Sequence, residues 1–124
     1  MLISQILIVD DNEADQFLNK IVIEEHDPSI EVLSAFDGNE ALEMLKSNPN
    51  KQPDIILLDI NMPGMSGLEF LEEYRLFPAQ SSVIVMLTSS IQNKDKKACM
   101  AYDFVKKFFS KPLEVSDLEE LSLL

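Results

Sequence analysis

Four short polar segments carry the side chains that could do chemistry in this sequence. Asp10 and Asp11 follow one apolar run, and Asp59 follows another. Thr88 and Lys111 follow two further segments of the same kind. Three carboxylates, a hydroxyl and an ammonium suit phosphoryl transfer, because that reaction depends on positioning and on neutralising the charge of the phosphoryl oxygens.

The three carboxylates also predict a divalent cation. Two carboxylates about 5 Å apart repel by about 3 kcal/mol at an effective dielectric constant of about 20, so a protein would hardly keep three together for stability. Mg²⁺ relieves such repulsion and prefers oxygen ligands of this kind. With Mg²⁺ and a lysine beside it, an aspartate can attack phosphorus and form an acyl phosphate.

The elements that must position these residues are short apolar runs. Residues 6–9, 55–58 and 83–87 are continuously apolar, and residues 31–36 and 108–109 are two weaker examples. Continuous runs of this length are typical of strands that helices cover on both faces of a sheet. We therefore expect five strands, each ending close to one of the turns or polar segments.

Helical spacing of apolar residues fills the intervals between the runs. Phe17, Leu18, Ile21 and Val22 predict a helix that begins after Asn12. Four more helices are expected, starting near residue 38, after residue 66, and over 93–102 and 114–124. Five strands alternating with five helices predict an open α/β fold, a doubly wound parallel sheet. Ligands of such sheets bind beyond the carboxyl ends of the strands, where the polar segments would meet.

Length and composition predict a single domain over residues 1–124. The net charge of −12 argues against nucleic acid, whose affinity for proteins comes mostly from lysine and arginine. The single cysteine, Cys99, cannot form an intrachain disulfide. The first residues lack the pattern of a secretion signal, and no apolar run reaches the length of a membrane helix. We expect a cytoplasmic domain that binds neither nucleic acid nor membrane.

Taken together, the four polar segments resemble the receiver domain of bacterial two-component response regulators. They read IVDD at 8–11, LLDINMPGMSG at 57–67, LTS at 87–89 and SKP at 110–112. The resemblance extends over essentially the whole chain, with the segments in the right order and at the right spacing. It implies a flavodoxin-like fold with strand order 2-1-3-4-5.

The resemblance also implies roles in phosphoryl transfer. Asp59 would be the phosphoacceptor, and a sensor histidine kinase or a histidine phosphotransfer protein would be the donor. Thr88 would move onto the phosphoryl group, and Lys111 would be its ion-pair partner. Phe108 falls where the family has its switch aromatic. Such a protein is not an enzyme but a phosphoacceptor that assists its own phosphorylation and dephosphorylation.

A metal site is implied by the same resemblance. Asp11 and Asp59 would bind Mg²⁺ directly, together with the backbone carbonyl of Asn61. Asp10 would act on Mg²⁺ through a water molecule.

The basic residues are unevenly distributed along the chain. Six of the 10 lie between positions 94 and 111, where Asp95 and Asp103 are the acids, so this window is locally basic in an acidic chain. Two interpretations remain open: a solvated helix face, or a surface around the fourth helix and fifth strand that an unidentified downstream protein recognises by charge.

Single residues argue against two other functions. A phosphatase with an aspartate nucleophile usually needs a second acid two positions later, where this chain has Asn61. An electron carrier of the flavodoxin type needs a phosphate-binding loop after the first strand, where this chain has acids. A receiver that only binds proteins without being phosphorylated, or one that acts as a phosphorelay intermediate, remains the alternative.

Overall fold

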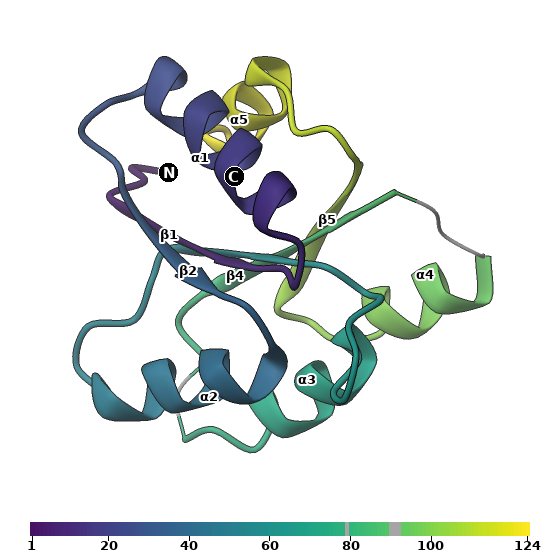
Figure 1. Cartoon of the computed structure of the whole chain (residues 1–124). Coiled ribbons are helices and arrows are strands. Elements are labelled where there is room, and N and C mark those ends of the chain that lie inside the picture. The colour runs from purple at the N-terminus through teal and green to yellow at the C-terminus, as the bar shows by residue number, and fades with distance from the viewer. Residues whose placement is uncertain (79, 90–92) are drawn as a thin grey trace.

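The computed structural model describes residues 1–78, 80–89 and 93–124. Its centre is a five-stranded parallel sheet with strand order β2-β1-β3-β4-β5, which lies between two layers of helices (Figure 1). The predicted doubly wound α/β fold and its strand order are confirmed. In the described part of the chain, no helix is both long and apolar enough to cross a membrane.

The strands follow the apolar runs closely. They are β1 (Gln5–Val9), β2 (Glu31–Ala35), β3 (Ile55–Leu58), β4 (Val83–Thr88) and β5 (Val105–Ser110). The last strand is longer than the apolar pair at 108–109 suggested. It begins at Val105, which pairs with Ile84 of β4, and pairing resumes at Lys107 opposite Val85 after a register shift at Lys106.

Both faces of the sheet are buried, which explains the continuous apolar runs. On β1, Ile6 and Ile8 pack into one core and Leu7 and Val9 into the other. Successive side chains of a strand point to opposite faces, so a strand covered on both sides has no solvent-facing position.

Two helices cover one face and three cover the other (Figure 1). The first layer holds α1 (Glu13–His26) and α5 (Val115–Leu121), and the second holds α2 (Gly38–Ser47), α3 (Gly67–Tyr74) and α4 (Asn93–Met100). The side chains of Asn12, Asp37 and Ser66 accept hydrogen bonds from backbone N–H groups at the starts of α1, α2 and α3. The starts expected for these three helices are confirmed, whereas α4 and α5 are shorter than expected.

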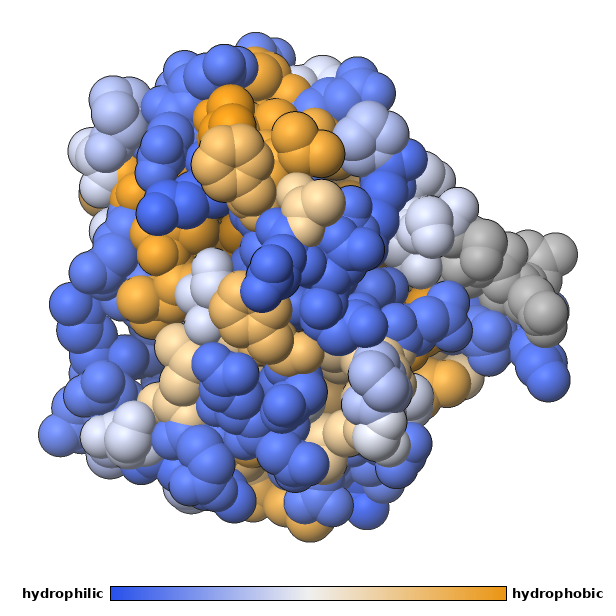
Figure 2. Space-filling view, viewed as in Figure 1, coloured by the Kyte–Doolittle hydropathy of each residue, from blue (hydrophilic) through white to orange (hydrophobic). Residues whose placement is uncertain are grey.

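The buried side of α1 is not the apolar stripe in its sequence. Gln16, Asn19 and Ile23 are its buried residues, whereas Phe17 is 64% exposed and Leu18 is 53% exposed. Gln16 occupies a buried position because its amide donates hydrogen bonds to backbone carbonyls at the ends of β1 and β2. Figure 2 shows the resulting apolar surface over α1.

Candidate functional site

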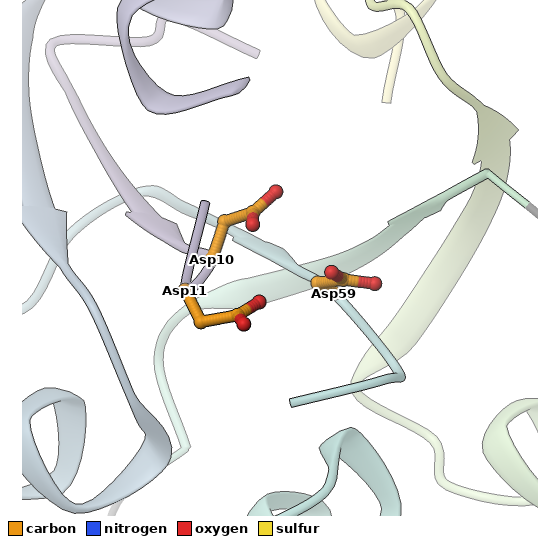
Figure 3. Close-up of side chains that lie close together, drawn as sticks. All are labelled: Asp10, Asp11 and Asp59. Atoms are coloured by element: carbon orange, nitrogen blue, oxygen red, sulfur yellow. The ribbon is translucent and has the colours of Figure 1, made fainter. Parts of the chain in front are cut away.

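Three carboxylates meet at the carboxyl ends of β1 and β3. Oxygens of Asp10, Asp11 and Asp59 all lie within 4.8 Å of one another (Figure 3). Asp10 and Asp59 are buried, whereas Asp11 is exposed. The backbone sets this arrangement, since Asp10 N–H donates to Ala35 O and Asp59 N–H donates to Val9 O, which extends the parallel sheet past the last strand residues. Asp10 and Asp59 are therefore held by the sheet edge, and Asp11 lies in the bend that follows it.

Lys111 reaches the same edge from the end of β5. Its Nζ lies 2.6 Å from Asp10 Oδ2, 2.8 Å from Asp15 Oδ2 and 3.3 Å from Asp59 Oδ2. Burial alone would lower the pKa of Lys111, but hydrogen bonds to Asp10 and Asp15 and the charge of Asp59 outweigh it and raise the pKa above its usual 10.5. The site therefore holds one permanent cation beside several anions.

The ionised form of Asp10 is destabilised in this arrangement. Burial raises the pKa of Asp10 above its usual value, and the hydrogen bonds from Lys111 and from the Asn12 N–H lower it only in part. The nearby charge of Asp59 raises this pKa further. A single lysine thus leaves the carboxylate charge incompletely balanced, and a second cation would stabilise it.

The loop after Asp59 folds back against the site. Asn61 N–H donates to Asp59 Oδ1 at 3.3 Å, and Gly67 N–H donates to Ile60 O at 2.9 Å. A Cβ atom on Gly67 would lie 2.7 Å from Asp59 O, so only glycine permits this approach of α3. Gly64 has a φ of +82°, a conformation that favours glycine. The loop thereby places Asn61, an exposed residue, beside the carboxylates.

Thr88 and Lys111 lie side by side at the ends of β4 and β5. Thr88 is 2% exposed, and its carbonyl accepts a 2.9 Å hydrogen bond from the Lys111 N–H. Phe108 lies opposite Met86 in the same strand pair, half-buried against the core on the α2, α3 and α4 side. Phe109 points to the other core, so the two rings lie on opposite faces as strand alternation requires.

Sequence reasoning missed two residues of the site, Asp15 and Gln16. Asp15 is a third partner of Lys111, and the Gln16 amide donates to the Asp10 carbonyl at 3.1 Å. Both lie in the first turns of the helix that starts directly after Asp10 and Asp11. That proximity in sequence is the signal that could identify them, whereas the apolar residues Phe17 and Leu18 lie on the exposed face of the helix.

The basic segment is a smaller surface than the sequence suggested. Lys111 belongs to the acidic site, and Lys107 Nζ donates to Glu120 of α5 at 2.6 Å. The remaining four lysines are exposed: Lys94, Lys96, Lys97 and Lys106. Three of them lie on α4 and one near the start of β5.

Comparison with known proteins agrees with this geometry. Residues 6–122 match the family model described as the response regulator receiver domain. A two-component response regulator from Cytophaga hutchinsonii has a similar structure, with a TM-score of 0.91 and 30% identity over 99% of this chain and 96% of that one. The chemotaxis protein CheY of Halobacterium salinarum is 34% identical, and the alignment covers 87% of this chain and 88% of that protein.

Some relatives are much longer than this chain. Protein-glutamate methylesterase/protein-glutamine glutaminase 1 of Cereibacter sphaeroides is 30% identical over 94% of this chain, which corresponds to 30% of the relative's length. The chain thus spans about a third of that relative, and the similarity does not extend to the rest of it. With the family model matched along nearly the whole chain and the fold shared with two-component response regulators, the chain belongs to the family of response regulator receiver domains.

Proposed function

We propose that residues 1–124 act as one receiver domain that accepts a phosphoryl group on Asp59. The observation that carries the proposal is the meeting of Asp10, Asp11 and Asp59 with the ammonium of Lys111 at one sheet edge. Receiver domains as a family interact with histidine kinases or histidine phosphotransfer proteins, and a phosphohistidine on such a protein is the proposed donor. In the transfer, an oxygen of Asp59 forms a bond to phosphorus while the bond between phosphorus and the histidine nitrogen breaks.

The three carboxylates fit a divalent cation. Their oxygens lie close enough to share one ion, and oxygen-only ligands suit Mg²⁺. We assign Asp11, Asp59 and the backbone carbonyl of Asn61 as direct ligands, and Asp10 as a ligand through water. Bound there, Mg²⁺ would neutralise carboxylate charge and the charge of an incoming phosphoryl oxygen.

The remaining residues of the site have roles toward the phosphoryl group. Lys111 donates a charged hydrogen bond to a phosphoryl oxygen, and Thr88 donates one from its hydroxyl. Movement of Thr88 toward Asp59 leaves space beside Met86 and Phe108, so that the Phe108 ring turns inward. This movement would carry the signal to α4 and β5, where the exposed lysines form the surface for a downstream protein.

Mass spectrometry after incubation with acetyl phosphate and Mg²⁺ tests the proposal. The wild type should gain about 80 Da, the mass of one phosphoryl group, and Asp59→Asn or excess EDTA should abolish this gain. Asp103→Asn is a matched control, because Asp103 is an exposed acid just before β5, at the opposite end of the sheet from Asp59. A labelled Asp59→Asn variant would overturn the assignment of the acceptor.

The same sample tests the path of the signal. Amide chemical shifts should change at residues 94–108 when beryllofluoride, which imitates the phosphoryl group, binds with Mg²⁺. Phe108→Ala should keep the beryllofluoride complex but reduce those distant shifts. Shifts confined to the loops around Asp11, Asp59 and Lys111 would show that the site is not coupled to this surface.

A further inference from the structure

Lys111 is held by a carboxylate that does not belong to the acidic cluster. A lysine ammonium has three N–H donors, and in this structure Asp10, Asp15 and Asp59 each accept from it. The contacts to Asp10 and Asp15, at 2.6 and 2.8 Å, are shorter than the 3.3 Å contact to Asp59. The ammonium therefore lies nearer to Asp10 and Asp15 than to the proposed phosphoacceptor.

Asp15 is fixed in position by the start of its helix. Its backbone N–H donates to Asn12 Oδ1 at 2.9 Å, and the Asn12 N–H donates to Asp10 Oδ1 at 3.0 Å. The adjacent Gln16 amide is buried and donates to the Asp10 carbonyl. The first turn of α1 is thus tied to the end of β1, which keeps the Asp15 carboxylate within reach of Lys111.

We propose that Asp15 is a positioning residue that competes with a phosphoryl group on Asp59 for the ammonium of Lys111. The inference rests on the proposed function, since it concerns how strongly that site binds a phosphoryl group. A phosphoryl group can form a short, charged hydrogen bond with Lys111 only if the ammonium shifts toward Asp59. Asp15 opposes that shift and thereby weakens phosphoryl binding and shortens its stay.

A metal ion would increase the share of Asp15 in the attraction that holds the Lys111 ammonium. The three carboxylates of the cluster would share their charge with the ion, which weakens the attraction of Asp10 and Asp59 for Lys111. Asp15 is outside that cluster and would keep its charge for the lysine. Its side chain is 35% exposed, whereas that of Lys111 is 12% exposed, so Asp15 can regain water when the lysine leaves it.

The surroundings leave room for this exchange. Asp15 and Lys111 both line a cavity of about 260 Å³ beside α1, together with Leu18, Asn19, Ser89 and Pro112. The lysine side chain therefore has open space beside Asp15, and its Nζ already lies 3.3 Å from Asp59 Oδ2, so a small shift is enough to exchange one partner for the other.

The test is a titration of Asp15→Asn with beryllofluoride at fixed Mg²⁺, followed by amide chemical shifts. The half-saturating concentration should fall about fivefold relative to wild type, a coupling typical of contacting charged groups. Glu13→Gln is the matched control, because Glu13 is an exposed acid in the same turn. It removes the same charge, and none of its described contacts involves Lys111, so its half-saturating concentration should change less than about twofold. Asp15→Glu keeps the carboxylate and should restore wild-type binding.

Salt separates competition for the lysine from general repulsion of the anion. Repulsion across solvent is screened strongly between about 0.05 and 0.5 M salt, whereas a short ion pair is screened much less. The ratio between Asp15→Asn and wild type should therefore persist at the higher salt concentration. Weaker binding by Asp15→Asn, an equal effect of Glu13→Gln, or a ratio that falls to one at high salt would overturn the inference. Wild type that fails to bind beryllofluoride with Mg²⁺ would instead overturn the proposed function.

Discussion

Asp54 and Asp10 are carboxylates at opposite ends of one sheet, and their surroundings differ in kind. Asp54 precedes β3, and its Oδ2 accepts hydrogen bonds from Ser4 N–H, Ser4 Oγ and Gln5 N–H at 2.7, 2.9 and 3.0 Å. Burial would raise the pKa of Asp54, but these hydrogen bonds outweigh it and lower the pKa. At the other end, burial raises the pKa of Asp10 despite its ion pair with Lys111.

The ionised carboxylate of Asp54 therefore stabilises the fold, whereas that of Asp10 reduces its stability. Asp54 has neutral donors and no neighbouring acid among its described contacts, so its charge is well solvated by the protein. Asp10 shares one lysine with two other carboxylates. A strained group of charges is what a site that binds cations and anions requires, because the ligand supplies the missing compensation.

The largest effect on stability is expected at the amino end of the sheet. Asp54→Ala should lower the free energy of unfolding by about 2 kcal/mol, because three donors that join β1 to the start of β3 lose their acceptor. Urea unfolding followed by circular dichroism measures this. Asp103→Ala, an exposed acid just before β5, is the control and should stay close to wild type. An Asp54→Ala variant with the same free energy of unfolding as wild type would show that Asp54 does not stabilise the fold.

Removing an acid at the carboxyl end should have the opposite sign. Asp11→Ala or Asp59→Asn should raise the free energy of unfolding by about 1 kcal/mol in EDTA, because like charges no longer repel. Millimolar Mg²⁺ should stabilise the wild type and affect Asp11→Ala much less. Asp103→Asn corrects for the change in net charge. Destabilised variants in EDTA, with an unaltered response to Mg²⁺, would contradict a strained cation site.

The smallest effect concerns pH, where the two carboxylates should act in opposite directions. The pKa of Asp54 is below 3.8 in the folded protein, so its contribution is present above that pH and is lost as pH falls through the lowered pKa. The pKa of Asp10 lies above 3.8, so its ionisation reduces stability as pH rises from 3.8 through the raised pKa. In EDTA, the free energy of unfolding of Asp54→Asn should therefore fall less than that of wild type as pH is lowered. The free energy of unfolding of Asp10→Asn should rise relative to that of wild type as pH increases. If the free energy of unfolding changed with pH in the same way for wild type, Asp54→Asn and Asp10→Asn, the opposite effects of the two carboxylates would be contradicted.

Much of the fold could be predicted from the sequence because burial determines where apolar residues occur along it. The runs at 6–9, 55–58 and 83–87 became strands since both faces of the sheet are covered, and Asn12 and Ser66 cap helices as their positions indicate. The start of β5 was less visible, because Lys106 lies at a register shift and Lys107 pairs through its backbone at the edge of the sheet, where a lysine side chain is tolerated.

The α1 helix shows where local pattern was insufficient. Its apolar stripe predicted a helix correctly, but Gln16 and Asn19 are buried and Phe17 is exposed. The burial of Gln16 depends on carbonyl groups from Ile8, Asp10 and Ala35, which come together only when β1 and β2 are paired. No property of the helix alone records those partners.

The sequence by itself determined the type and order of the chemical groups: the acids after β1 and β3, the hydroxyl at the end of β4 and the lysine after β5. Parallel strands then had to bring these groups to one edge, so their convergence followed from topology. Only the tertiary structure decided how Lys111 divides its three donors and that Asp15 takes one of them. The physical reason is that sequence spacing restricts which groups can meet, whereas distances of a few tenths of an ångström, set by helix docking and strand register, decide which partners a buried charge has.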